Sequence, residues 1–237
     1  MIDYRTVEQR LIEHLGLERR PVAVAFLTEA PEGVAPFTGT MPSGCSFWRL
    51  AAEGRVFHTA PADHYNCPIG SYTHNIALPP ERAGELDQTL SLMVSAGYIR
   101  MQEVPGIPSL PESPGAVVYA PLGATPVEPS VVICSGRPAR LMLLGEAALR
   151  AGVAAQAPLL ARPTCMAIPA ALAQGMVTST GCIGNRVYTE LGDDELYAVV
   201  AGRDVARVAD EVATIAAANA QLAEYHRARR RALAITR

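Results

Sequence analysis

The chain has 237 residues, of which 49% are hydrophobic and 18% charged, with a net charge of −3. This composition is ordinary for a globular protein, and it lacks the basic field that nucleic-acid binding requires. All 20 basic residues are arginine, so enzymes that form a Schiff base on their own lysine and P-loop enzymes are excluded. No apolar stretch reaches the ~18 residues of a membrane helix, and the first residues lack the apolar core of a secretory signal. We therefore expect a cytoplasmic protein with reduced cysteines and no membrane or nucleic-acid partner.

The predicted elements alternate between helices and short apolar strands. The first elements are expected over residues 3–16 (helix), 21–27 (strand), 46–53 (helix), 55–58 (strand), 69–77 (helix) and 81–97 (helix). Seven prolines and three glycines from Pro105 to Pro129 surround a short strand at 116–119, and this segment is predicted to link two halves. The remaining elements are expected over 131–134 (strand), 138–151 (helix), 176–178 (strand), 196–200 (strand) and 203–235 (long helix). The pattern predicts a single domain of the α/β (or α+β) class.

An internal repeat is indicated by the order of residues around four cysteines. Each copy reads cysteine, short helix, glycine, short strand, loop, second cysteine, glycine and a Tyr-Thr pair. The first copy carries Cys45 and Cys67, and the second carries Cys165 and Cys182. We therefore predict two pseudo-repeated halves, at approximately 20–104 and 115–202, followed by the long helix.

The four repeated cysteines are the predicted functional residues. Each lies beside a glycine or a proline, in loops that allow the backbone to approach an inorganic centre closely. Four thiolates are the ligands of a 4Fe–4S cluster, and the Cys67–Pro68 pair repeats the ending of bacterial ferredoxin motifs. Structural zinc sites use closely spaced pairs, which this sequence lacks. A 4Fe–4S cluster is therefore the predicted cofactor. The fifth cysteine, Cys134, lies in an apolar strand and is predicted to be a buried core residue.

Residues near the cysteines are further candidates for cofactor binding. Arg49 and Arg186 each follow a cysteine by four residues, which on a helix places a guanidinium near the sulfur. There they would balance an anionic cluster or hold a carboxylate. Gly184 and Asn185 lie in the same segment as Arg186 and are included in the predicted site.

Other interpretations remain open at this stage. Cys67 begins a predicted helix, where thiolates are stabilised, and His64 is near enough in sequence to act as its base in a thiol enzyme. Haem is a second possible cofactor, with His58, His64 and His74 as candidate ligands. A binding module for a small anionic ligand, with purely structural cysteines, is a third interpretation. If the protein is an enzyme, an oxidoreductase is one of the expected classes. The expected partners are a small-molecule substrate or a redox partner protein, and a second copy bound through the long helix.

Three sequence strings around the cysteines carry a family resemblance. They are NCPIG at 66–70, TCMAIP at 164–169 and GCIGNR at 181–186. With the acidic turn and strand from Asp193, they make the chain resemble, over most of its length, the prokaryotic ArCR-type domain family of unknown function. The resemblance implies that the cysteine loops belong together. The family's occurrence among anaerobes agrees with iron–sulfur chemistry.

Overall fold

The computed structural model describes residues 2–153, 159–160 and 163–233. A mixed sheet runs through the middle of the molecule, with strand order β2-β3-β1-β4-β7-β6-β5. Its strands are β1 (Val22–Leu27), β2 (Phe57–Thr59), β3 (Ala116–Pro121), β4 (Val131–Gly136), β5 (Leu159–Leu160), β6 (Met176–Ser179) and β7 (Leu196–Ala201). Neighbouring strands are antiparallel except the parallel pair β5 and β6. The prediction of a single α/β domain is confirmed.

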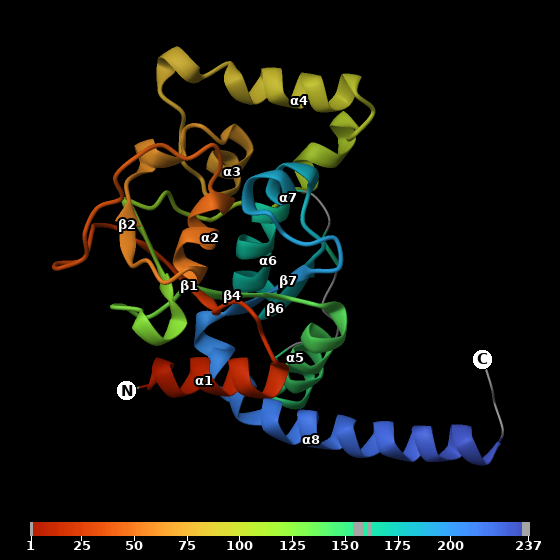
Figure 1. Ribbon diagram of the computed structural model, residues 1–237. Coiled ribbons are helices and arrows are strands. Elements are labelled where there is room, and N and C mark those ends of the chain that lie inside the picture. The colour runs from red at the N-terminus through yellow and green to blue at the C-terminus, as the bar shows by residue number, and fades with distance from the viewer. Residues whose placement is uncertain (1, 154–158, 161–162, 234–237) are drawn as a thin grey trace.

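Helices cover both faces of this sheet (Figure 1). One face packs against α1 (Tyr4–Leu15), α5 (Pro138–Arg150) and α8 (Gly202–Ala232), and the other against α2 (Cys45–Ala52), α6 (Ala167–Gln174) and α7 (Ile183–Thr189). Side chains alternate between the two faces because successive strand residues point in opposite directions. In β4, Val131 and Ile133 join the core under α2 and α6, whereas Val132 and Cys134 join the core under α5 and α8.

The ends of the first helix show how local sequence sets an element boundary. The Asp3 carboxylate accepts hydrogen bonds from the backbone N–H groups of Arg5 and Thr6 and thereby caps the start of α1. Gly16 ends the helix in the left-handed conformation, with a φ of 60°. Leu11 and Leu15, on the inner side of α1, are fully buried against the sheet, so the amphipathic pattern predicts the packed face correctly.

The two halves of the sheet share one connectivity. In the first half β3 lies between β2 and β1, and in the second half β7 lies between β6 and β4. The strands β1 and β4 pair antiparallel at the centre. In each half one cysteine-bearing helix segment, α2 or α6, precedes the second strand, and one short helix, α3 (Pro68–Thr73) or α7, precedes the last strand. This shared order agrees with the predicted repeat.

The proline-rich segment differs from its predicted role as a linker. Its strand, β3, is fully buried and pairs with both β1 and β2. The apolar residues at 116–120 are buried in the core between β1 and β2. The prolines of the segment lie at the end of β3 or outside this strand. Strand pairing thus puts the boundary between the halves between β3 and β4, later than the predicted 104–115.

Each half also carries its own insertion. In the first half, residues 74–115 join α3 to β3 and contain η2 (Pro80–Arg82), α4 (Glu85–Ser95) and η3 (Met101–Gly106). The helix α4 lies far from the sheet, at the top of Figure 1. In the second half, α5 and β5 are inserted between β4 and α6.

The last helix, α8, matches the predicted helix at 203–235 closely, although residues 234–235 of that prediction lie outside the described residues. Its first three turns pack on the sheet, and its remainder projects away from the body (Figure 1). Among the helices in the described part of the chain, none is long and apolar enough to cross a membrane.

Candidate metal centre

The four repeated cysteines line one cavity of about 410 Å³. They come from equivalent positions in the two halves. Cys45 begins α2, and Cys165 lies in the short turn η5 (Thr164–Met166) that leads into α6. Cys67 and Cys182 are the N-cap residues of α3 and α7. Cys45 and Cys165 are buried, whereas Cys67 and Cys182 are half-buried. Equivalent positions in the two halves therefore bring all four thiols to one cavity.

Within each half, a polar contact holds the two cysteine loops together. In the first half, the backbone N–H groups of Gly44 and Gly70 lie near the Cys67 sulfur and lower the pKa of that thiol. In the second half, the Cys182 backbone N–H donates to the Thr164 hydroxyl at 2.6 Å. Gly44 and Thr164 each immediately precede the first cysteine of their half. The two loops in each half are therefore tied at equivalent positions.

Contacts between the halves cross at the same place. The Thr73 hydroxyl, from the first half, donates to the Gly70 carbonyl at 2.9 Å and lies near the sulfur of Cys165 in the second half, where it lowers the pKa of that thiol. The Asn185 amide, from the second half, is directed at Cys45 in the first and lowers the pKa of that thiol. Asn185 is buried and lines the cavity, and neither its amide nitrogen nor its amide oxygen reaches a partner at normal hydrogen-bond distance in the described structure. This amide is therefore left with hydrogen-bonding capacity inside the site.

The electrostatics of the cavity keep the thiols of Cys45, Cys67 and Cys165 protonated. Burial raises the pKa of Cys45 well above its ordinary value, and the nearby thiols of Cys165 and Cys67 raise it further. Burial also raises the pKa of Cys165 and of Cys67. Of the described residues that line the cavity, none is basic. No basic side chain among the described lining residues is therefore available to stabilise thiolates here, and a cation bound in the cavity would supply that charge.

Single metal ions and clusters place different demands on their cysteine ligands. A single tetrahedral ion would hold its sulfurs at about 2.3 Å and so draw them close together. In the described part of the chain, no three His, Cys, Asp or Glu side chains are placed to hold one ion. A 4Fe–4S cluster binds each cysteine to a different iron and so spaces its ligands further apart. The Asn185 amide and the backbone N–H groups of Gly44 and Gly70 are the polar groups that lie near the Cys45 and Cys67 sulfurs and lower the pKa values of these thiols.

The histidines lie behind the cysteines and not in the cavity. His64 is buried, its Nε2 lies 2.8 Å from the Thr59 hydroxyl, and burial, with His74 nearby, lowers its pKa to about 3. Burial also lowers the pKa of His74 to about 4. His58 bonds the Val34 carbonyl. A neutral His64 bonded to Thr59 and a raised pKa at Cys67 both disfavour the nucleophile–base pair, and no histidine among the described residues lines the cavity as a haem ligand.

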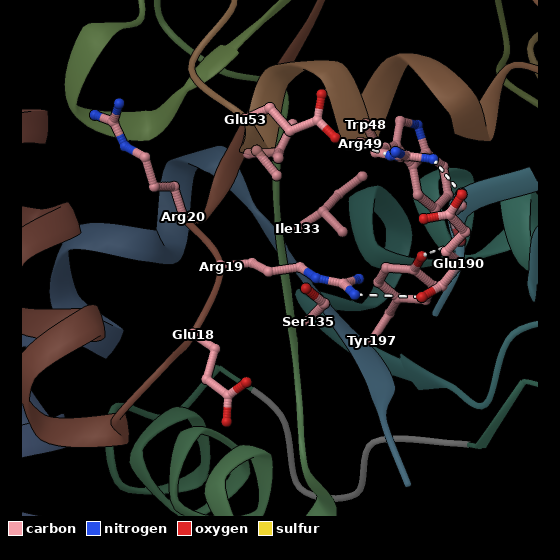
Figure 2. A pocket seen from close by; sticks show the side chains of 13 residues that line it. Glu18, Arg19, Arg20, Trp48, Arg49, Glu53, Ile133, Ser135, Glu190 and Tyr197 are labelled. Atoms are coloured by element: carbon pink, nitrogen blue, oxygen red, sulfur yellow. Dashed lines mark hydrogen bonds and ion pairs between the residues drawn. The ribbon is translucent and has the colours of Figure 1, made fainter. Parts of the chain in front are cut away.

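The structure places Arg49 at a different cavity, of about 350 Å³ (Figure 2). Its guanidinium pairs with Glu53 at 2.8 Å and with Glu190 at 3.0 Å. Arg19 points to the same place and donates to the Glu190 carbonyl. Opposite charges on α2 and after α7 thus hold Arg49 away from the cysteines, and the expected contact with the cluster ligands is not formed.

Arg186 likewise stays outside the cysteine cavity. Its guanidinium donates to the backbone carbonyls of Thr180, Gly192 and Glu195, which lie on both sides of α7. It thereby fixes the loop that carries Cys182. Gly184 and Asn185, the other candidates in this segment, do line the cavity.

The cavity's outer wall was not predicted from the sequence. That wall comes from the first half's insertion and includes Leu90 and Met93 of α4 and Val104 of η3. On α4 the leucines differ in burial, since the Leu90 side chain is 7% exposed and the Leu92 side chain is 69% exposed. Thr73 and Thr164 were also missed, although Thr73 belongs to the repeated Tyr-Thr pair.

Comparison with known protein families gives one match for this chain. The sequence profile of the DUF169 family, described as uncharacterised ArCR, matches residues 10–211. No curated protein and no solved structure matches the chain. The matched range includes both cysteine pairs and every strand, so the chain belongs to the uncharacterised ArCR family.

Proposed function

We propose that this protein binds a 4Fe–4S cluster through Cys45, Cys67, Cys165 and Cys182 and works as a redox protein in the cytoplasm. When bound, such a cluster supplies one-electron transfer, to a partner protein or to a bound small molecule. A cytoplasmic location belongs to the proposal because free thiols persist there.

The observation that carries the proposal is the convergence of four buried or half-buried thiols on one cavity without a basic neighbour among the described lining residues. The nearby thiols of Cys165 and Cys67 raise the pKa of Cys45, and Cys67 raises that of Cys165, so a positively charged centre would stabilise the thiolates. The chain's own polar groups then have defined tasks. The N–H groups of Gly44 and Gly70 lie near the Cys67 sulfur and would stabilise its thiolate, and the Asn185 amide, which has no partner in the described structure, would donate to the centre.

The test is metal and sulfide analysis of protein purified without oxygen. We expect brown protein with broad visible absorption and about four iron and four sulfide per chain. Single Cys→Ser changes at each of the four positions should each remove most of the iron. The matched control is Cys134→Ser, since Cys134 is buried on the opposite face of the sheet. Colourless protein, zinc in place of iron, or a sharp Soret band from haem would each refute the proposal.

The proposal includes a homodimer formed through α8. From residue 217 onward nearly every described residue of this helix is exposed, and Leu222 and Tyr225 are 59% and 55% exposed. A helical extension with no packing partner is marginally stable in water. We expect light scattering to give twice the chain mass, and Leu222→Asp with Tyr225→Asp to give a folded monomer. A monomeric unmodified chain would refute this part.

A further inference from the structure

The cysteine cavity is larger than its cysteine-lined corner. It extends from the four thiols to α4 and η3, and its far wall is formed by side chains of the insertion at 74–115. The apolar residues of that wall are Leu90, Met93, Ile99, Val104 and Ile107, and Met166 and Ile183 lie on the cysteine side. Pockets that bind small organic molecules have this size and this predominantly apolar lining.

The polar side chains of the outer part are already engaged with the protein. Thr89 donates to the Glu85 carbonyl, and the Asn66 amide bonds both the Met41 carbonyl and Arg82. Glu103 is the one acidic side chain among the described lining residues, and it pairs with Arg100 at 2.9 Å. The outer wall therefore offers a ligand mainly apolar contact.

The charge of the cavity excludes one broad class of ligand. A carboxylate or phosphate would enter a space with no basic side chain among its described lining residues, beside four cysteines and Glu103. Moving such an anion out of water without a partner is costly. An uncharged molecule meets no such penalty and gains from apolar burial.

We infer that this cavity binds an uncharged, largely apolar small molecule between the insertion and the four cysteines. The inference rests on the proposed function, since the bound molecule would lie against the cluster. The insertion thus gives the first half a task that the second half lacks.

Methionine methyl groups provide a local readout of binding. Met93 and Met166 line the cavity, whereas Met142 on α5 and Met176 on β6 lie elsewhere. The experiment records NMR spectra of anaerobic protein labelled with ¹³C-methyl methionine during titration with 2-naphthol, which is uncharged, or with 2-naphthoate, which has the same rings and one negative charge. We expect 2-naphthol to shift the Met93 and Met166 signals saturably and to bind at least about tenfold more tightly than 2-naphthoate.

Two substitutions on the insertion sharpen the test. Ile107→Trp fills the cavity and should abolish the shifts, and Ile107→Ala, which removes apolar contact, should weaken binding. The matched control is Leu92→Trp, because Leu92 is exposed on α4 and lies outside the cavity lining. This control should bind 2-naphthol as the unmodified protein does.

Iron content measured on the same samples separates the two proposals. Iron-loaded protein in which neither cavity methionine shifts, in which Met142 shifts equally, or in which 2-naphthoate binds as tightly would overturn the inference. Iron-free protein that shows the expected shifts at Met93 and Met166 would support the apolar site and overturn the proposed cluster.

Discussion

The two halves of the chain share a connectivity but differ in what surrounds their cysteines. Each supplies one buried and one half-buried cysteine from equivalent helix starts. The insertion of the first half covers the cavity, and the first half also carries a pair of buried histidines behind the cysteines. The second half places its insertion, α5, on the opposite face of the sheet. The repeated part therefore builds the centre, and the unrepeated part of the first half determines what reaches it.

The largest expected difference between the halves is sensitivity to acid. His64 and His74 have pKa values of about 3 and about 4 in the folded protein, and no histidine occurs between residues 131 and 201. An unfolded chain binds these protons below pH ~6.5, whereas the folded chain does not until pH ~4. The unfolding free energy therefore keeps its full value above pH ~6.5 and decreases as the pH falls toward ~4, because protons then bind the unfolded chain preferentially. It should decline by about 2 kcal/mol per histidine at pH ~5.

Replacing one of these histidines should remove the part of the decline in unfolding free energy that its protonation causes. Neither ring nitrogen of His74 has a partner in the described structure, and the ring packs edge-on against Phe26. We expect His74→Phe to halve the decline in unfolding free energy between pH ~7.5 and ~5, measured by urea denaturation. His226→Gln, on the exposed part of α8, is the control. An unchanged decline in His74→Phe would show that the acid sensitivity arises elsewhere.

A smaller effect should separate the equivalent glycines that follow the N-cap cysteines. A Cβ at Gly70 would lie 2.9 Å from the Cys67 sulfur, whereas a Cβ at Gly184 would meet only the Tyr188 ring at 3.7 Å. Gly70→Ala should therefore displace the Cys67 sulfur, cost about 1–3 kcal/mol and lower the iron content. Gly184→Ala is the matched control and should retain the iron, with a slight gain in helix stability. Equal iron in the two variants would contradict the close approach at Gly70.

Much of this fold follows from local sequence pattern. Strand and helix positions were predicted well because the apolar runs and the helical spacing are strong, as in β4 and α8. The grouping of the four cysteines was inferred from the repeat, because equivalent positions in two halves related by a pseudo-two-fold meet near the axis. Cys134 was correctly expected in the core, since it continues an apolar strand.

The parts that escaped prediction depend on long-range contacts. Arg49 lies one helical turn after Cys45, but its partner Glu190 comes from a segment that no local pattern connects to it. The predicted strand at 116–119 lies in a segment whose many prolines indicate a linker. Only the pairing of β3 with β1 reveals that this strand belongs to the sheet. The wall formed by α4 and η3 could not be predicted, because no local pattern shows that residues 74–115 fold back over the cysteines.

The smallest expected effect concerns how firmly the insertion is held over the cavity. Arg82 binds Glu85 through two hydrogen bonds of 2.7 Å and also donates to Asn66, the residue before Cys67. Because these groups are partly exposed, the contact should be worth less than about 1 kcal/mol. Arg82→Gln should leave the iron content unchanged and speed hydrogen exchange at residues 85–95 about threefold, with α7 as an internal reference.

Arg100→Gln is the matched control, since Arg100 pairs with Glu103 inside the insertion and forms no link between the insertion and the Cys67 loop in the described contacts. If Arg82→Gln leaves exchange in α4 unchanged, the insertion is held by its apolar contacts alone. In that case Leu90, its one buried residue on α4, is the side chain to truncate next, because burying a leucine contributes more than an exposed ion pair.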